Sequence, residues 1–204
     1  MNGRVWRLCV GLAVAGLCGC GSSPRIQALT PRSVVLAFGD SLTAGTGAAE
    51  NESYPAVLAG QLGCKVVNAG VPGEVSRDGL VRLPALLKQH KPNLVLLCHG
   101  GNDMLQNVSD AEIARNVQAM VEAAQDCGAD VVLLGVPKPG LFLKAPSFYA
   151  EVAKTCGIPY EAKALSEILA TRSLKSDTLH PNAEGYRKLA DRVAALVRAS
   201  RTGK

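Results

Sequence analysis

A serine, an aspartate and a histidine occur in a pattern that suits nucleophilic chemistry. Ser41 follows Gly39 and Asp40 at the end of an apolar run, and Asp177 precedes His180 by three residues near the other end of the chain. A serine hydroxyl becomes a useful nucleophile when an imidazole takes its proton and a carboxylate orients that imidazole. These three residue types therefore predict acyl transfer, provided that the fold brings them together.

Two further positions offer hydrogen-bond donors of the kind that an oxyanion needs. Gly70 and Asn102 each follow an apolar run, in Asn68-Ala69-Gly70 and Gly100-Gly101-Asn102. A backbone N–H and a side-chain amide can bind the charge that develops in a tetrahedral intermediate. Each motif alone also fits a turn or a helix cap. Their order along one chain favours the catalytic interpretation.

The apolar runs and the segments between them predict one α/β domain. The runs expected as strands are 34–38, 65–68, 93–98, 130–134 and 158–160. Helical patterns separate them at 53–62, 80–89 and after Ser109, with a closing helix after Asn182 and weaker candidates at 148–154 and 162–170. Apolar strands that alternate with helices indicate a three-layer α/β/α fold with a mostly parallel five-stranded, flavodoxin-like sheet. Parallel strands end at one edge of a sheet, so Ser41, Gly70 and Asn102 should gather there.

The first 32 residues are expected to lie outside this domain. Arg4 and Arg7 introduce an apolar stretch, residues 8–17, that is too short to span a bilayer. The sequence Leu17-Cys18-Gly19-Cys20 resembles a bacterial lipobox, with lipid attached to Cys20. We therefore expect a signal peptide over 1–19, a tether over 20–32 and the domain over 33–200. The expected location is the cell envelope, at the periplasmic face of the outer membrane, and an ordinary secretory signal is the alternative.

Composition argues against several other classes of protein. The 204 residues are 48% hydrophobic, and the net charge of +5 falls to about +3 when the arginines at 4 and 7 are removed, which is too diffuse to indicate nucleic-acid binding. No cysteine lies in a CxxC pair, and no HExxH, P-loop or dinucleotide fingerprint occurs, so neither metal nor cofactor is expected. A Gly-x-Ser-x-Gly elbow is absent as well. Whether Cys127 and Cys156 form a disulfide stays open.

Three other titratable residues lie near the proposed site. His99 ends an apolar strand with no carboxylate partner apparent in the sequence, and we interpret it as structural or pocket-lining. Asp40 is expected to accept N–H groups of the serine turn and so to stiffen it. Asp103 should do similar work in its own loop.

Taken together, four blocks resemble those of the SGNH (GDSL) hydrolases. They are Gly39-Asp40-Ser41-Leu42, Gly70, Gly100-Gly101-Asn102-Asp103 and Asp177-Thr178-Leu179-His180. Residues 66–69, 79–90 and 180–182 further resemble a bacterial subgroup of multifunctional esterases, acyl-CoA thioesterases and lysophospholipases. The resemblance implies Ser41 as nucleophile, His180 as general base and Asp177 as its orienting carboxylate. It also implies an oxyanion hole made by the N–H groups of Ser41 and Gly70 and the amide of Asn102.

The expected activity is that of a lipid-anchored serine esterase acting on small acyl, aryl or lysophospholipid esters without metal or cofactor. Thioesters are chemically accessible, but acyl-CoA is scarce outside the cytoplasm. Two alternatives stay open: an O-acetyl esterase of cell-wall or surface polysaccharide, and a non-catalytic surface lipoprotein. Residues 137–143 depart from the subgroup, and they form either an acyl-chain wall or membrane-facing lip, or a surface loop. The sequence leaves the oligomeric state open.

Overall fold

A computed structural model describes residues 24–140 and 142–201, and the expected signal peptide and Cys20 lie outside these residues. Within them, five strands form one fully parallel sheet in the order β2-β1-β3-β4-β5. The strands are β1 Val34–Gly39, β2 Lys65–Gly70, β3 Leu94–Cys98, β4 Asp130–Leu134 and β5 Tyr160–Glu161. The predicted fold class, a three-layer α/β/α arrangement with the flavodoxin-like strand order, is confirmed.

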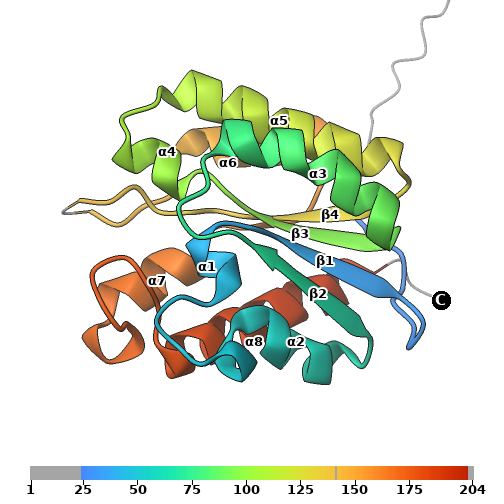
Figure 1. Cartoon of the computed structure of the whole chain (residues 1–204), viewed down its shortest axis with the longest axis horizontal. Helices are drawn as coiled ribbons and strands as arrows, with labels where there is room; N and C mark the ends of the chain where they lie inside the picture. The colour runs from blue at the N-terminus through green and yellow to red at the C-terminus, as the bar shows by residue number, and fades with distance from the viewer. Residues whose placement is uncertain (1–23, 141, 202–204) are drawn as a thin grey trace, which may run out of the picture.

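Helices cover both faces of this sheet (Figure 1). One face carries α3 Ser76–His90, α4 Gly101–Leu105, α5 Asp110–Asp126 and α6 Ser147–Cys156. The other carries α1 Ser41–Ala44, α2 Tyr54–Leu62, α7 Ala164–Ala170 and α8 Ala183–Ala199. Single 3-10 turns occur at Glu50–Glu52 and Arg172–Leu174. Because both faces are covered, the central strands β1, β3 and β4 are buried along almost their whole length.

The two longest helices begin where the sequence places capping side chains. Ser109 accepts a bond from the N–H of Glu112 at 3.3 Å and caps α5. Asn182 accepts a bond from the N–H of Gly185 at 3.0 Å and caps α8. Each helix then buries a stripe of apolar residues against the sheet. The helices expected after Ser109 and Asn182 thus begin there, and the cap of α8 fixes the main chain immediately after His180.

Most predicted elements differ from the structure by one or two residues at an end, and contacts between segments account for the bounds of two of them. The helix expected from residue 80 begins at Ser76, because Asp103 accepts bonds from the N–H and hydroxyl of Ser76 at 2.8 and 2.5 Å. Pro84 is accommodated inside this helix. The last strand is Tyr160–Glu161, shifted toward the carboxyl end, because its pairing with β4 starts at Leu133.

The expected tether over 20–32 is shortened by the structure, because Ile26 belongs to the domain. Ile26 is 2% exposed, its N–H donates to the carbonyl of Ser200 at 2.8 Å, and it pairs with Arg201. The N–H of Gln27 donates to Asp130 at the start of β4. The described chain therefore enters the domain beside the amino ends of the strands, at the edge opposite to Ser41.

The described part of the chain contains no helix that is long and apolar enough to cross a membrane. Its four cysteines, Cys64, Cys98, Cys127 and Cys156, are all free thiols. Cys98 is fully buried in β3. Cys127 and Cys156 are not joined to each other.

The burial of Ile26 generates a stability prediction. Ile26→Ala should lower the free energy of unfolding by about 2–4 kcal/mol, because it empties a packed site at the end of α8. Chemical denaturation followed by circular dichroism measures this change, and exposed Arg25→Ala is the matched control, with an expected change below about 0.5 kcal/mol. Equal stability of Ile26→Ala and the control would show that the segment is only a tether.

Candidate active site

The serine turn is held by a buried carboxylate. Ser41 is the first residue of α1, and its neighbour Asp40 caps that helix by accepting the N–H of Leu42 at 3.0 Å. Burial raises the pKa of Asp40 above its ordinary value, and the bond from Leu42 opposes that rise. The expected role of Asp40 in stiffening the turn is confirmed by these contacts. The turn therefore presents the Ser41 hydroxyl from a fixed backbone.

The structure brings Ser41, His180 and Asp177 together, although the first two lie 139 residues apart in the sequence. Ser41 Oγ lies 3.0 Å from His180 Nε2, and His180 Nδ1 lies 2.8 Å from Asp177 Oδ2. The other oxygen of Asp177 accepts the N–H groups of Leu179 and His180 at 2.7 and 2.8 Å. One carboxylate thus orients the imidazole and also shapes the loop that carries it.

The surroundings of Asp177 favour its charged form. Desolvation would raise its pKa, but the bonds from the His180 ring and from two backbone N–H groups outweigh that effect and lower it. Asp177 is therefore ionised at neutral pH, as a residue that fixes the imidazole tautomer must be. The ring nitrogen that faces Ser41 is then left as a proton acceptor.

Asn102 lies beside the same serine turn and comes from the segment that follows β3. It lies in the first turn of α4, which follows Gly100, a residue with φ of 111°. Its Nδ2 donates to the carbonyl of Glu74 at 2.9 Å and lies 3.4 Å from Asp40 Oδ2. The first bond fixes the plane of the amide, and the second contact is long. Both N–H groups of the amide therefore have acceptors, and the one that makes the long contact to Asp40 belongs to a side chain that lines the hollow beside the serine turn.

Gly70 does not reach this space, and its expected role in an oxyanion hole is corrected by the structure. Gly70 lies within β2, its N–H donates to Asn68 Oδ1 at 3.0 Å, and it does not line the hollow beside Ser41. A Cβ at Gly70 would lie 2.1 Å from the backbone nitrogen of Ala44. Glycine is thus required there because α1 packs closely on β2.

Gly73, three residues further on, lies beside this space instead. It lines the hollow together with Ser41 and Asn102, and its φ of 81° is one that glycine adopts freely. The sequence signal for it was the second glycine in Gly70-Val71-Pro72-Gly73, beyond the strand rather than at its end.

A hollow of about 240 Å³ opens beside the Ser41 hydroxyl. Its polar end is formed by Ser41, Asn102 and His180. Its other walls are mostly apolar and include Leu105, Val136, Pro137, Pro139, Leu143, Leu169 and Leu179. Pro137, Pro139 and Leu143 of this segment therefore supply part of the wall, whereas Phe142 is 83% exposed. The arrangement suits an ester carbonyl at the polar end and an apolar group beyond it.

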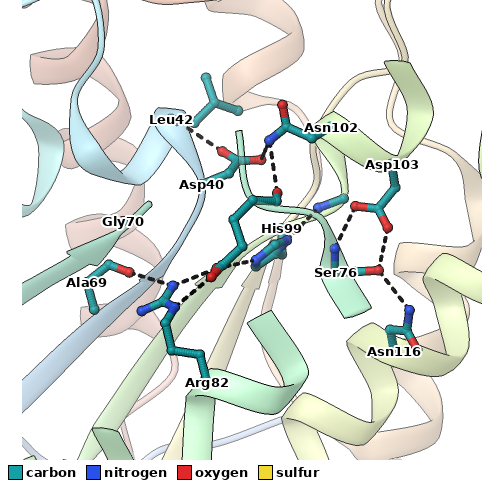
Figure 2. A network of polar contacts seen from close by, with 12 residues as sticks. Asp40, Leu42, Ala69, Gly70, Ser76, Arg82, His99, Asn102, Asp103 and Asn116 are labelled. Carbon is teal, nitrogen blue, oxygen red and sulfur yellow. Dashed lines mark hydrogen bonds and ion pairs between the residues drawn. The ribbon is translucent and has the colours of Figure 1, made fainter. Parts of the chain in front are cut away.

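A network of buried charges lies behind the polar end of this hollow (Figure 2). His99 is fully buried, and its Nε2 lies 3.1 Å from Glu74 Oε2, a partner that the sequence did not reveal. Arg82 donates to both carboxylate oxygens of Glu74, at 2.7 and 2.6 Å. Desolvation would raise the pKa of Glu74, but the bonds from His99 and Arg82 and their charge lower it to about 2. Glu74 and Arg82 were both missed because their partners lie on other elements.

The described residues contain no group of three or more His, Cys, Asp or Glu side chains arranged to hold a metal ion.

Comparison with known proteins identifies the family. Residues 37–188 match the family model described as GDSL-like lipase/acylhydrolase. The chain belongs to this family. The resemblance drawn from its four blocks is therefore confirmed, and the chain is a carboxylic ester hydrolase.

Several relatives match the chain over most of its length. Esterase TesA of Pseudomonas aeruginosa is 31% identical over 190 residues, which cover 87% of this chain and 94% of that protein. Thioesterase 1/protease 1/lysophospholipase L1 of Escherichia coli is 31% identical over 168 residues, or 78% of this chain and 81% of that protein. A crystal structure of TesA superposes with a TM-score of 0.75 at 29% identity and covers 82% of this chain and 99% of that one.

Proposed function

We propose that this hydrolase cleaves acyl esters through a covalent acyl-enzyme formed on Ser41. The observation that carries the proposal is the unbroken line of contacts from Asp177 through His180 to Ser41, at 2.8 and 3.0 Å. These distances are those at which a base can take a proton from a nucleophile. The line ends at the polar end of an apolar hollow.

The reaction then proceeds in two halves. Ser41 Oγ attacks the ester carbonyl while His180 Nε2 takes its proton, and the resulting intermediate expels the alcohol, which receives that proton from His180. Water attacks the acyl-serine, and His180 again takes a proton and returns it to Ser41 Oγ as the acid leaves. Asp177 stabilises the imidazolium in both halves. One ester and one water are converted to one acid and one alcohol.

Three donors are proposed to bind the oxyanion: the N–H groups of Ser41 and Gly73 and the Asn102 amide. All three residues line the hollow on the side of the serine turn. Such donors stabilise the charge that appears only as the carbonyl becomes tetrahedral, so they act mainly on turnover. Gly73 replaces Gly70 in this proposal because the N–H of Gly70 is already bonded to Asn68.

The proposed substrates are short- to medium-chain acyl esters, aryl esters and lysophospholipids. An apolar wall beyond the carbonyl position supports acyl groups larger than acetyl. Relatives named esterase, arylesterase and thioesterase/lysophospholipase support the same range. The part of the chain that would set the length limit is the wall formed by Leu143 and Leu169.

We further propose that the chain is a lipoprotein of the cell envelope, acylated at Cys20 and held at the periplasmic face of the outer membrane. The lipobox-like sequence before Cys20 supports this proposal. The chain enters the domain at the sheet edge opposite to Ser41, so a lipid anchor on that side leaves the hollow accessible to substrate. Mass spectrometry of the chain from its native membrane tests the proposal, and an unprocessed, unacylated N-terminus would contradict it.

The catalytic roles predict a matched set of kinetic effects with p-nitrophenyl butyrate. Ser41→Ala should abolish turnover, and Asn102→Ala should lower kcat by about 10²–10³ because one oxyanion donor is lost. Asn68→Ala is the control, since Asn68 bonds the N–H of Gly70 outside the hollow. It should keep kcat within about threefold of wild type. Asn102→Ala at wild-type turnover would remove Asn102 from the oxyanion hole.

The apolar wall predicts a change in chain-length preference. Leu143→Trp should fill the hollow and lower kcat/KM for octanoyl esters by about tenfold or more, while acetyl esters keep most of their rate. A series of p-nitrophenyl esters from acetyl to octanoyl measures this. Phe142→Trp is the control, because that side chain is exposed. If Leu143→Trp slows all esters equally, residue 143 does not bound the acyl site.

A further inference from the structure

The carboxylate of Glu74 is held from two sides by residues of other elements. Glu74 lies in the loop between β2 and α3, and its side chain is 8% exposed. Arg82 of α3 donates hydrogen bonds to both carboxylate oxygens, and His99, which follows β3, contacts one of them at 3.1 Å. The loop after β2 is therefore bonded through one side chain to helix α3 and to the residue that follows β3.

Both partners of Glu74 are themselves fixed. The Nδ1 of His99 accepts the N–H of Gly100 at 3.2 Å, so its Nε2 is the nitrogen that donates to Glu74. Arg82 also donates to the carbonyl of Ala69 at 3.1 Å, and its guanidinium lies 4.3 Å from the centre of the Phe38 ring. Arginine suits such a site because its planar fork binds a carboxylate while its face stacks on an aromatic ring.

The main chain of Glu74 connects this network to the oxyanion donors. Its carbonyl accepts the Asn102 amide at 2.9 Å, and its backbone nitrogen is bonded covalently to Gly73. In the view of Figure 2, Asn102 lies near the top and His99 and Arg82 lie below it. Without its side-chain bonds, the Glu74 main chain would keep the bond from its N–H to the carbonyl of Val71 at 3.2 Å. Its carbonyl, and with it the Asn102 amide, would then be held less firmly.

We propose that Glu74, Arg82 and His99 form a positioning network that fixes the Asn102 amide, through the Glu74 carbonyl, in the orientation that binds the oxyanion. The proposal rests on the proposed function of Asn102 and names residues that act behind it. None of the three side chains lines the hollow, so they are positioning residues rather than catalytic ones.

A role in orientation explains why the network is ionic. A buried ion pair contributes little more to stability than apolar side chains of similar volume, because desolvation offsets much of the attraction between its charges. Its bonds are directional, however, and three donors fix the carboxylate in one place. Turnover is sensitive to such placement, since a displacement of about 1 Å can cost about 100-fold in rate.

A double-mutant cycle between Glu74 and Asn102 tests the proposal. The kcat and KM for p-nitrophenyl butyrate are measured for wild type, Glu74→Gln, Asn102→Ala and the double variant, with folding checked by near-UV circular dichroism. Glu74→Gln should lower kcat by about 10- to 100-fold and leave KM within about threefold. In the Asn102→Ala background the same change should lower kcat less than about twofold, because its effect acts through Asn102.

A matched control breaks an ion pair away from the site. Glu184→Gln removes the exposed pair with Arg187 and should change kcat less than about twofold in either background. Equal loss from Glu74→Gln in both backgrounds, or no loss in the wild-type background, would overturn the proposal. Ser41→Ala in the same assay distinguishes a failure of the positioning proposal from a failure of the proposed function. If the proposed function is wrong, the Ser41→Ala variant will still turn over the ester.

If the Glu74→Gln variant does not fold, a second double-mutant cycle, between His99 and Asn102, tests the same proposal. His99→Leu removes the donor to Glu74 and should lower kcat at least about tenfold, whereas His99→Gln keeps an N–H near the position of Nε2 and should restore most of the rate. The loss from His99→Leu should also nearly vanish in the Asn102→Ala background. Equal turnover of His99→Leu and His99→Gln would contradict the proposal.

Discussion

The active site depends on the docking of the loop that carries His180 against the loop that follows Ser41. The two loops meet closely at Gly47, where a Cβ would lie 2.2 Å from Ser176 Oγ and 2.6 Å from the carbonyl of Pro181. The φ of Gly47 is 99°, so glycine is required there for its backbone angles as well as for space. From α8, the hydroxyl of Tyr186 donates to the carbonyl of Thr46 at 2.8 Å. These contacts hold the imidazole within reach of the serine.

Around that contact, the sheet sets where the other groups appear. Gly39 of β1 pairs with both Gly70 of β2 and Cys98 of β3, so three strands end at the same level. The loops that leave them carry Ser41, Gly73 and Asn102 to the same hollow. Two carboxylates then stiffen the arrangement. Asp177 is bonded by its own loop, and Glu74 is bonded by residues of other elements. Both local and long-range contacts thus position the catalytic and oxyanion-binding groups.

Much of this could be predicted from the sequence because the signals are local. The buried strands are continuous apolar runs, and the caps of α5 and α8 are single side chains next to helical patterns. The serine turn and the Asp177–His180 pair are short motifs whose residues bond one another. The parallel sheet then requires that groups at strand exits share one edge.

The features that were missed depend on contacts between distant segments. The early start of α3 requires Asp103, and the partner of His99 is Glu74, 25 residues away. Gly70 and Gly73 look alike in sequence, and their roles are distinguished by contacts in the fold: Gly70 is bonded to Asn68 and packed against α1, whereas Gly73 lines the hollow. The place of Ile26 in the domain likewise depends on the far end of α8. No local pattern encodes such pairings.

The most direct test of the account is the site and base dependence of the acyl-enzyme. Wild type and His180→Ala are mixed with p-nitrophenyl butyrate, quenched in acid at successive times and analysed by peptide mass spectrometry. The account predicts a butyryl group on the peptide that contains Ser41, formed within the first turnover in wild type and slower by about 10³-fold or more in His180→Ala. A butyryl group on another residue, or equal rates of acylation in the two proteins, would contradict it.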